Sequence, residues 1–297
     1  MKNGFLTDLV AKNRRNKLKW RVSSALLAGI ALLFALQGFT LADPDNDHKA
    51  TAINDCSSIT QAGQYFLAND LTCLAVGISI TVSDVKLELR GHTIAGTLSS
   101  SVILVNGGGA SLFKIEIEGP GTVFGGMAGI EFDDVHHSWV HNVVAVGNGD
   151  GIDIGASACS TNNPTIAATA STENVFSDNV AAANFFCGIS VNGGNHNSFI
   201  HNNLTGNPSD GLLLFNAKNN VNVRQNTADG NGLNGIEVGM LGSGNIIDHN
   251  TAFGNGQGGS AGFDLVDQNM NCDHNMWTNN SFNLSSSFNL SSPACIK

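Results

Sequence analysis

The tripeptide Asp150-Gly151-Ile152 is one of six copies of a short phrase in this chain. The others are Ala128-Gly129-Ile130, Cys187-Gly188-Ile189, Asp210-Gly211-Leu212, Asn234-Gly235-Ile236 and Ala261-Gly262-Phe263. The phrase recurs mostly every 22 to 27 residues, with one step of 37. Such a period is typical of a solenoid, in which each turn buries its apolar face against the next.

The residues around the phrase indicate strands rather than helices. Ile78 to Val82 and Val85 to Leu89 alternate apolar and polar residues, which is the pattern of a strand with one buried face. Aligning the phrase gives an inward column of eight residues: Ile78, Val102, Ile130, Ile152, Ile189, Leu212, Ile236 and Phe263. Because parallel crossovers are right-handed, we expect an all-β, right-handed parallel β-helix of about eight coils with a cap at each end.

Asparagine repeats in the same register. One column contains Asn142, Asn179, Asn202, Asn226, Asn250 and Asn280, and a second contains Asn148, Asn184, Asn207, Asn231 and Asn255. Asparagine tolerates left-handed backbone, and stacked amides bond to one another. Both columns are therefore expected to be structural turns.

The N-terminus is typical of an export signal. Basic residues from Lys12 to Arg21 precede an apolar run from Val22 to Phe39, and Thr40-Leu41-Ala42 offers a cleavage site. A retained membrane anchor is the alternative, since the run approaches the ~20 residues that span a bilayer. We expect a signal peptide over residues 1–42, a flexible leader over 43–55, an N-terminal cap over 56–76, the β-helix over 77–267 and a C-terminal cap over 268–297. The mature protein would be periplasmic or extracellular and free of the membrane.

Charge excludes some partners. Removing residues 1–42 leaves seven Lys and Arg against 23 Asp and Glu, a formal net charge of −16. Such a chain repels nucleic acid, and it repels anionic sugars unless a divalent cation intervenes. The six cysteines all follow the signal, and an even number in an exported chain predicts disulfides. We favour pairing between sequence neighbours: Cys56–Cys73, Cys159–Cys187 and Cys272–Cys295.

The repeats and the turns resemble the right-handed parallel β-helix proteins of the pectin-lyase-like group. Gly63 to Cys73, Leu89 to Ile94 and the closing Asn271-Cys272-Asp273-His274-Asn275 resemble exported bacterial members of unassigned activity. The resemblance implies the fold, and it implies a polysaccharide or another cell-envelope component as partner. It leaves open a hydrolase, a lyase, an epimerase or a non-catalytic surface protein.

Glu131 and Asp153 are the leading catalytic candidates, because they should point outward one rung apart, about 5 Å between backbones. Two carboxylates at such a short distance raise one another's pKa, and a general acid requires a raised pKa. Asp150 would flank the pair, and Glu237 with Asp264 would form a second pair. Solvated surface acids, or a Ca²⁺ site of Glu131, Asp133 and Asp153, are the alternatives.

Other candidates surround this pair. Asn148 to Asp153 resembles the Asn-x-Asp-Gly-x-Asp motif of polygalacturonase-like hydrolases, but Cys187-Gly188-Ile189-Ser190 stands where that family has further catalytic residues. Asp133, His136, His137 and Arg224 are the candidate substrate-binding residues. The mature chain has no cluster of basic residues along the sequence, which disfavours lyase chemistry.

Overall fold

The computed structural model describes residues 50–155, 159, 170–220, 222–256, 262–283, 285–287 and 295–296. The expected signal peptide, most of the leader and most of the insertion between Gly155 and Glu173 lie outside these residues. In the part of the chain that the structure describes, no helix has the length and apolar character needed to cross a membrane.

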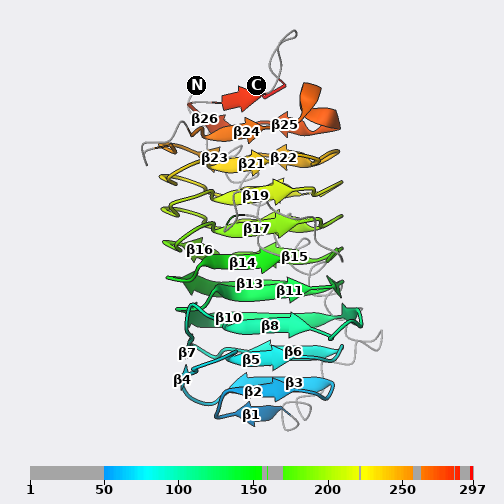
Figure 1. Ribbon diagram of the computed structural model, residues 1–297, viewed down its shortest axis with the longest axis vertical. Coiled ribbons are helices and arrows are strands. Elements are labelled where there is room, and N and C mark those ends of the chain that lie inside the picture. The colour runs from blue at the N-terminus through cyan, green and yellow to red at the C-terminus, as the bar shows by residue number, and fades with distance from the viewer. Residues whose placement is uncertain are drawn as a thin grey trace, which may run out of the picture. The chain divides into compact units, whose positions relative to one another are not determined.

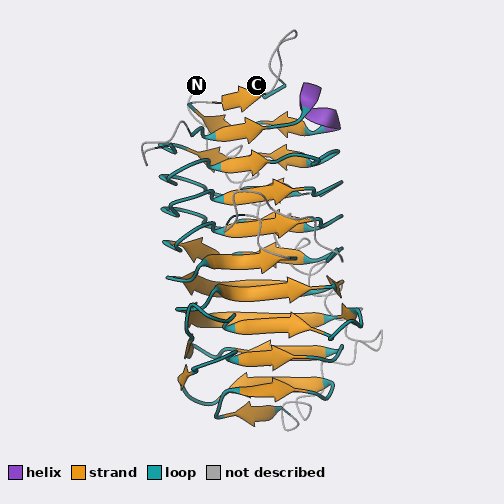
Figure 2. Cartoon of the chain, viewed as in Figure 1, coloured by secondary structure: helices purple, strands orange, loops and turns teal. Residues whose placement is uncertain are grey.

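In the unit formed by residues 50–297, parallel strands are stacked along one axis and form two large sheets (Figure 1, Figure 2). The ten-stranded sheet consists, in order, of β2 (Ser57–Ile59), β5 (Ile78–Ile80), β8 (Ile103–Asn106), β11 (Ala128–Asp133), β14 (Asp150–Ile154), β17 (Ile189–Asn192), β19 (Leu212–Phe215), β21 (Ile236–Val238), β24 (Leu265–Asp267) and β27 (Ser285–Ser287). The central path of the 13-stranded sheet consists of β1 (Thr51–Ile53), β3 (Gly63–Leu67), β6 (Val85–Glu88), β10 (Ile115–Phe124), β13 (Trp139–Val146), β15 (Val175–Ser177), β18 (Ser198–Ile200), β20 (Val223–Arg224), β22 (Ile246–Asp248) and β25 (Met276–Thr278).

Short strands complete the coils. β4 (Leu71–Thr72), β7 (Thr93–Ala95) and β16 (Val180–Ala182) join the 13-stranded sheet, while β9 (Leu112–Phe113) pairs with β12 (Val135–His136) and β23 (Thr251–Ala252) pairs with β26 (Ser281–Phe282). The described residues include one short 3₁₀ segment, η2 (Met270–His274). The predicted all-β parallel β-helix is confirmed.

The predicted inward column is correct at six of its eight positions. Register pairs Ile78 with Ile103 rather than with Val102, and it pairs Ile236 with Leu265 rather than with Phe263. Phe263 lies before β24, where its backbone N–H donates to Asn234 Oδ1. The phrase therefore marks the start of a coil, but differing turn lengths shift the strand that follows it.

The stack extends beyond the aligned column at both ends. β2 pairs with β5 and β27 pairs with β24, so parallel strands occur within the ranges that we expected to form caps. Serine occupies the column at these rungs, since Ser57 pairs with Ile78 and Ser285 with Leu265. These two rungs were not recognised in the sequence, because the prediction relied on an apolar residue at this position.

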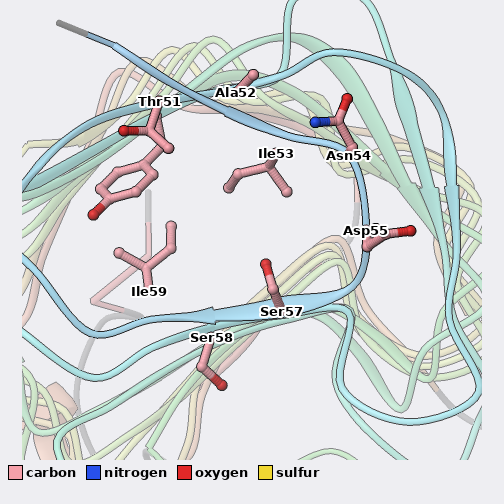
Figure 3. Close-up of a pocket in the computed structure, with 9 residues that line it drawn as sticks. Thr51, Ala52, Ile53, Asn54, Asp55, Ser57, Ser58 and Ile59 are labelled. Carbon is pink, nitrogen blue, oxygen red and sulfur yellow. The ribbon is translucent and has the colours of Figure 1, made fainter.

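The first coil surrounds a cavity of about 360 Å³ (Figure 3). It is lined by β1, β2, the turn between them and Tyr65. Among the described strands, β1 and β2 are the terminal members of their sheets, and each has a described neighbour on one side only. The cavity thus lies at the end of the stack.

Glycine is required in the phrase because neighbouring coils approach closely there. A Cβ atom added to Gly188, Gly211 or Gly235 would lie 2.5–2.6 Å from a carbonyl oxygen of the next coil. These glycines do not need their conformational freedom; they need the absence of a side chain.

Replacing Gly211 with alanine is expected to lower the free energy of unfolding by about 2 kcal/mol, because the methyl group would overpack this contact. Urea denaturation monitored by circular dichroism measures the effect. Gly230→Asn is the matched control, since Gly230 has a φ of +64° in open space and asparagine tolerates that conformation. Equal losses in the two variants would contradict the close-approach explanation.

Three buried asparagine ladders run along the coils. In the first, Asn179, Asn202, Asn226, Asn250 and Asn280 bond side chain to side chain at 3.0–3.1 Å. Asn148, Asn184, Asn207, Asn231 and Asn255 form the second at 3.0–3.3 Å. The sequence placed Asn142 in the first ladder, but Val143 occupies that position and donates its N–H to Asn179.

The third ladder was not predicted. It is formed by Asn174, Asn197, Asn220, Asn245 and Asn275, in which each amide accepts the backbone N–H of the preceding member. Its spacing is hidden in the sequence by the many other asparagines. The three ladders satisfy backbone groups at the turns, where the sheets cannot.

The disulfides pair as expected: Cys56–Cys73, Cys159–Cys187 and Cys272–Cys295. No described cysteine is free. Structural disulfides form in oxidising compartments, and this pairing agrees with an exported protein.

Candidate functional site

The predicted carboxylate pair lies on the outer face of the ten-stranded sheet. Register places Glu131 directly opposite Asp153, one rung apart. The environment differs from the expectation, because Asp153 is only 4% exposed and its Oδ1 atom has no hydrogen-bond partner. Burial, with the nearby charges of Asp150 and Glu131, raises the pKa of Asp153 well above its usual range.

Further buried acids extend this pair into a carboxyl row, which we define as Glu131, Asp150, Asp153, Asp210 and Glu237. Burial raises the pKa of Asp210 to about 6 and that of Glu237 to about 8. The Asp210 charge contributes to the shift of Glu237. Burial also raises the pKa of Glu131, despite the hydrogen bond donated by Ser101.

Asp264 does not belong to the row, contrary to the predicted pair with Glu237. Glu237 lies opposite Val266, and Asp264 precedes strand β24. Its Oδ1 atom accepts the side-chain and backbone N–H groups of Asn255. Asp264 therefore ends the second asparagine ladder.

The carboxyl row is not an open groove for a polymer. Asp150, Asp153, Asp210 and Glu237 are all less than a tenth exposed. On the same outer face, Cys187, Leu213 and Phe215 form a small apolar cluster against which Cys159 packs. These four carboxylates have little access to solvent, whereas Glu131 is partly exposed, and a catalytic role for Glu131, Asp150 and Asp153 stays a prediction.

The proposed calcium ligands do not form a converging set among the described residues. Two groups of three converge: Asp150 with Cys159 and Cys187, and Glu116 with Glu118 and His141. Glu131 is bonded by Ser101, and Asp133 Oδ2 accepts the Asn106 amide at 2.7 Å. Calcium takes six to eight oxygen ligands, and a calcium site of Glu131, Asp133 and Asp153 stays a prediction.

The predicted substrate-binding residues are separated. His136 lies on β12 at a turn, between Asp134 (3.0 Å) and Thr172 (2.7 Å). His137 pairs with Glu173 at 2.9 Å. Arg224 lies on β20 of the 13-stranded sheet, opposite Ile200 and Asp248, and so belongs to a different sheet from Glu131 and Asp153.

A second cluster, not predicted from the sequence, lies on the outer face of the 13-stranded sheet. We call it the Trp139 surface and define it as Lys86, Glu116, Glu118, Trp139 and His141. Register places Glu116 between Lys86 and Trp139, and Glu118 opposite His141. Three successive coils therefore contribute to one patch. β6, β10 and β13 alternate along their length, so apolar residues face the core and these polar ones face outward.

Trp139 is fixed in place at one side of this patch. Its ring stacks on the His141 imidazole with centroids 3.9 Å apart, and its Nε1–H group donates to Ser177 Oγ at 3.0 Å. The side chain is nevertheless 43% exposed. One face of the indole is thus held by the protein while part of the ring remains open to solvent.

The charged groups of the patch form a network. The Lys86 ammonium lies 2.6 Å from Glu118 and 3.4 Å from Glu116. Partial burial lowers the pKa of Lys86, but the hydrogen bond to Glu118 and the charge of Glu116 outweigh it and raise that pKa. Asn142 donates to His141 Nδ1 at 3.2 Å, so Nε2 carries the proton and donates to Glu116 Oε1 at 3.3 Å.

The residues of this surface lie far apart in the sequence. Lys86 and Glu116 are 30 residues apart, and Glu116 and Trp139 are 23 apart. These coils precede or overlap the first copies of the phrase, so the phrase could not align them. Alternation in Val85-Lys86-Leu87 and Ile115-Glu116-Ile117-Glu118 identified the strands but not their register.

Comparison with known proteins agrees with the fold. The family model described as "Right handed beta helix region" matches residues 156–292. No curated protein sequence matches the chain. Among solved structures, the A-module of Azotobacter vinelandii mannuronan C-5 epimerase AlgE6 is 13% identical, with a TM-score of 0.39, and the match covers 81% of this chain and 80% of that one.

Two further solved structures are similar. The A-module of A. vinelandii AlgE4 has 13% identity, a TM-score of 0.35, and coverage of 82% of this chain and 89% of that one. The enzymatically active domain of bacteriophage CBA120 tailspike protein 2 has 14% identity, a TM-score of 0.39, and coverage of 83% and 42%. TM-scores this low carry no argument about fold or function. On its own stacked parallel strands and the match to the family model, the chain is a right-handed parallel β-helix protein.

Proposed function

We propose that this protein is exported and binds a polysaccharide through the Trp139 surface. The observation that carries the proposal is the exposed, immobilised Trp139 ring. A sugar ring has an apolar face of C–H groups, which stacks on an indole and removes apolar surface from water. Because His141 and Ser177 already hold the ring, little side-chain entropy is lost on binding.

The neighbouring charges supply hydrogen bonds to sugar hydroxyl groups. Glu116 is adjacent to Trp139 in register, and Lys86 is adjacent to Glu116. The carboxylates accept from hydroxyl groups and the ammonium donates to them. An apolar platform with a few fixed polar groups is the usual composition of a small-molecule site.

The charge balance favours a neutral polysaccharide. The patch has two carboxylates and one ammonium, and the chain after the expected signal carries a net charge of −16. A polyuronate would be repelled by the surplus negative charge of the patch and of the chain. Coils repeat at ~4.8 Å, so a glycan lying along the stack could contact several of them.

Replacing Trp139 with alanine is expected to weaken binding of a neutral polysaccharide tenfold or more, because the stacking platform is lost. Affinity electrophoresis on a panel of neutral and uronic polysaccharides identifies the ligand, and titration calorimetry then measures the dissociation constant. Phe253→Ala is the control, since Phe253 is 37% exposed on a different part of the chain.

Two outcomes would count against the proposal. Binding that survives Trp139→Ala would place the glycan elsewhere on the molecule. No binding by the wild-type protein to any member of the panel would favour a structural protein of the cell envelope.

A further inference from the structure

We infer that the Cys159–Cys187 disulfide is a redox-exchange site that accepts two electrons from an external dithiol. The dithiol attacks Cys159 Sγ, Cys187 Sγ leaves, and the Asp210 carboxyl group supplies the proton that the departing sulfur needs. The site belongs to the ten-stranded sheet, and the inference is independent of glycan binding by the Trp139 surface.

The two sulfur atoms of this disulfide differ in accessibility. Cys187 is fully buried and packs with Leu213 and Phe215, whereas Cys159 is partly exposed. Access is one of the factors that decide which sulfur of a disulfide a thiolate attacks. An external thiolate therefore reaches Cys159, and Cys187 is the leaving group.

A buried carboxyl group faces the leaving sulfur. Asp210 Oδ1 accepts the Asn234 backbone N–H at 2.8 Å, and Asp210 Oδ2 lies 3.9 Å from Cys187 Sγ. One carboxyl oxygen is thus anchored while the other is directed at the sulfur. A protonated carboxyl group donates through its O–H. Without that proton, a buried thiolate beside carboxylates would be strongly disfavoured.

Two neighbouring acids interact with the Asp210 carboxyl group. Burial, with the charge of Asp150, raises the pKa of Asp210 to about 6, and Glu237 is the other titratable neighbour. Asp210 therefore holds a proton under mildly acidic conditions in which an ordinary aspartate is ionised. Asp150 Oδ1 also accepts the Cys187 backbone N–H at 2.9 Å, so Asp150 is a positioning residue for the leaving sulfur.

The exchange balances in two steps. A thiolate of the dithiol forms a bond to Cys159 Sγ while the bond between the two cysteines breaks, and Cys187 takes the electron pair and the proton of Asp210. The second thiolate of the dithiol then attacks its own sulfur in the mixed disulfide and releases Cys159. The dithiol is oxidised to a disulfide, the protein gains two thiols, and Asp210 recovers its proton from solvent.

The Cys56–Cys73 disulfide is an internal control for this chemistry. It has the same asymmetry, because Cys56 is exposed and Cys73 is buried. Cys73, however, belongs to the apolar core cluster, whereas Asp210 lies on a later coil. The two disulfides of one molecule therefore separate the effect of the carboxyl group from that of burial.

The first test compares the reduction rates of these two disulfides. The folded protein is partly reduced with a water-soluble phosphine, which makes the same attack on sulfur and stays reactive at acidic pH. Freed thiols are alkylated and quantified by peptide mass spectrometry. We expect the rate for Cys159–Cys187 divided by that for Cys56–Cys73 to rise about tenfold from about pH 7.5 to about pH 5, because the acid form of Asp210 accumulates.

Two variants separate proton donation from a structural effect. Asp210→Asn should abolish the rise in this ratio, whereas Asp229→Asn, at a partly exposed position, should leave it unchanged. Circular dichroism at each pH verifies that the proteins are folded. The ratio cancels the titration of the phosphine itself.

The second test identifies the sulfur that is attacked. Glutathione is a monothiol, so its reaction stops at the mixed disulfide. After a brief exposure and an acid quench, we expect about ten times more adduct on Cys159 than on Cys187. Adduct mainly on Cys187, a ratio of reduction rates that does not change with pH, or an Asp210→Asn variant with the wild-type profile would each overturn the inference.

Discussion

Replacing Asn202 with alanine is expected to lower the free energy of unfolding by about 3 kcal/mol or more. Its Nδ2 group donates to Phe176 O at 2.9 Å and to Asn226 Oδ1 at 3.0 Å. Its Oδ1 atom accepts from the backbone and side-chain N–H groups of Asn179, both at 3.1 Å. Alanine would leave several buried groups without partners, and each costs ~1–3 kcal/mol.

Equilibrium unfolding in urea, with the disulfides intact, measures this loss. The neighbouring Asn203 provides the control, because its side chain is exposed and accepts a hydrogen bond from Thr205 rather than joining a ladder. Asn203→Ala should change the free energy by no more than ~0.5 kcal/mol. If the two variants lose the same stability, the ladder is not what holds the coils in register.

The asparagine ladders show which features of the fold are predictable from the sequence and which are not. Repetition of Asn202, Asn226 and Asn250 identified the first ladder, because a stacked amide must recur once per coil. The parallel repetition of Asn207, Asn231 and Asn255 identified the second. Asn142 was placed wrongly, since spacing alone cannot separate a ladder position from its neighbour. Asn142 has a φ of +56° and occupies the left-handed turn position just before the ladder.

The second large effect concerns pH and the carboxyl row. Stability is expected to fall by several kcal/mol as the pH rises from about 4 to about 8. Asp210 and Glu237 have pKa values raised to about 6 and about 8, so the folded protein holds protons that the unfolded chain releases. Below the unfolded pKa of ~4 this contribution is fully present, and it is lost as the pH passes the folded values.

The shifted pKa of Asp248 changes stability in the opposite direction, but it does so below about pH 4. Hydrogen bonds from Thr278 and from His249 lower its pKa to about 2. Its contribution is therefore present above the unfolded pKa and lost only as the pH falls toward 2. It cannot mask a loss of stability between pH 4 and pH 8.

Asp210→Asn should flatten this dependence and stabilise the protein at pH 8. Asp210 Oδ1 accepts the Asn234 backbone N–H at 2.8 Å, and an amide oxygen can do the same. The fold already contains this substitution one coil later, where Asn234 Oδ1 accepts the Phe263 N–H at 3.0 Å. Removing the Asp210 charge should also lower the pKa of Glu237, since that charge contributes to its shift.

Urea denaturation of both proteins at several pH values tests this expectation. Asp229→Asn is the control, because Asp229 accepts the Phe253 N–H at 2.8 Å in the same way but at a partly exposed position. A wild-type stability that rises between pH 5 and pH 8, or an Asp210→Asn variant with unchanged slope, would contradict the role assigned to burial.

The candidate site was harder to predict than the fold. The pairing of Glu131 with Asp153 was correct, because the phrase fixes the register of their two strands. Their burial was not predictable, since alternation shows which side chains leave the core but not what covers the outer face. The Trp139 surface was missed because Lys86, Glu116 and Trp139 come from coils whose turns differ in length.

The ladders also bear on how such a chain can change during evolution. Residues 213–236 make up one full coil of 24 residues. Their loss would place Asn202 beside Asn250, Asn207 beside Asn255 and Asn197 beside Asn245. Each ladder would therefore again pair asparagine with asparagine. A duplication would lengthen the ladders in the same way. Genes of this kind can therefore gain or lose whole coils by recombination, while the Trp139 surface, built from earlier coils, keeps its neighbours.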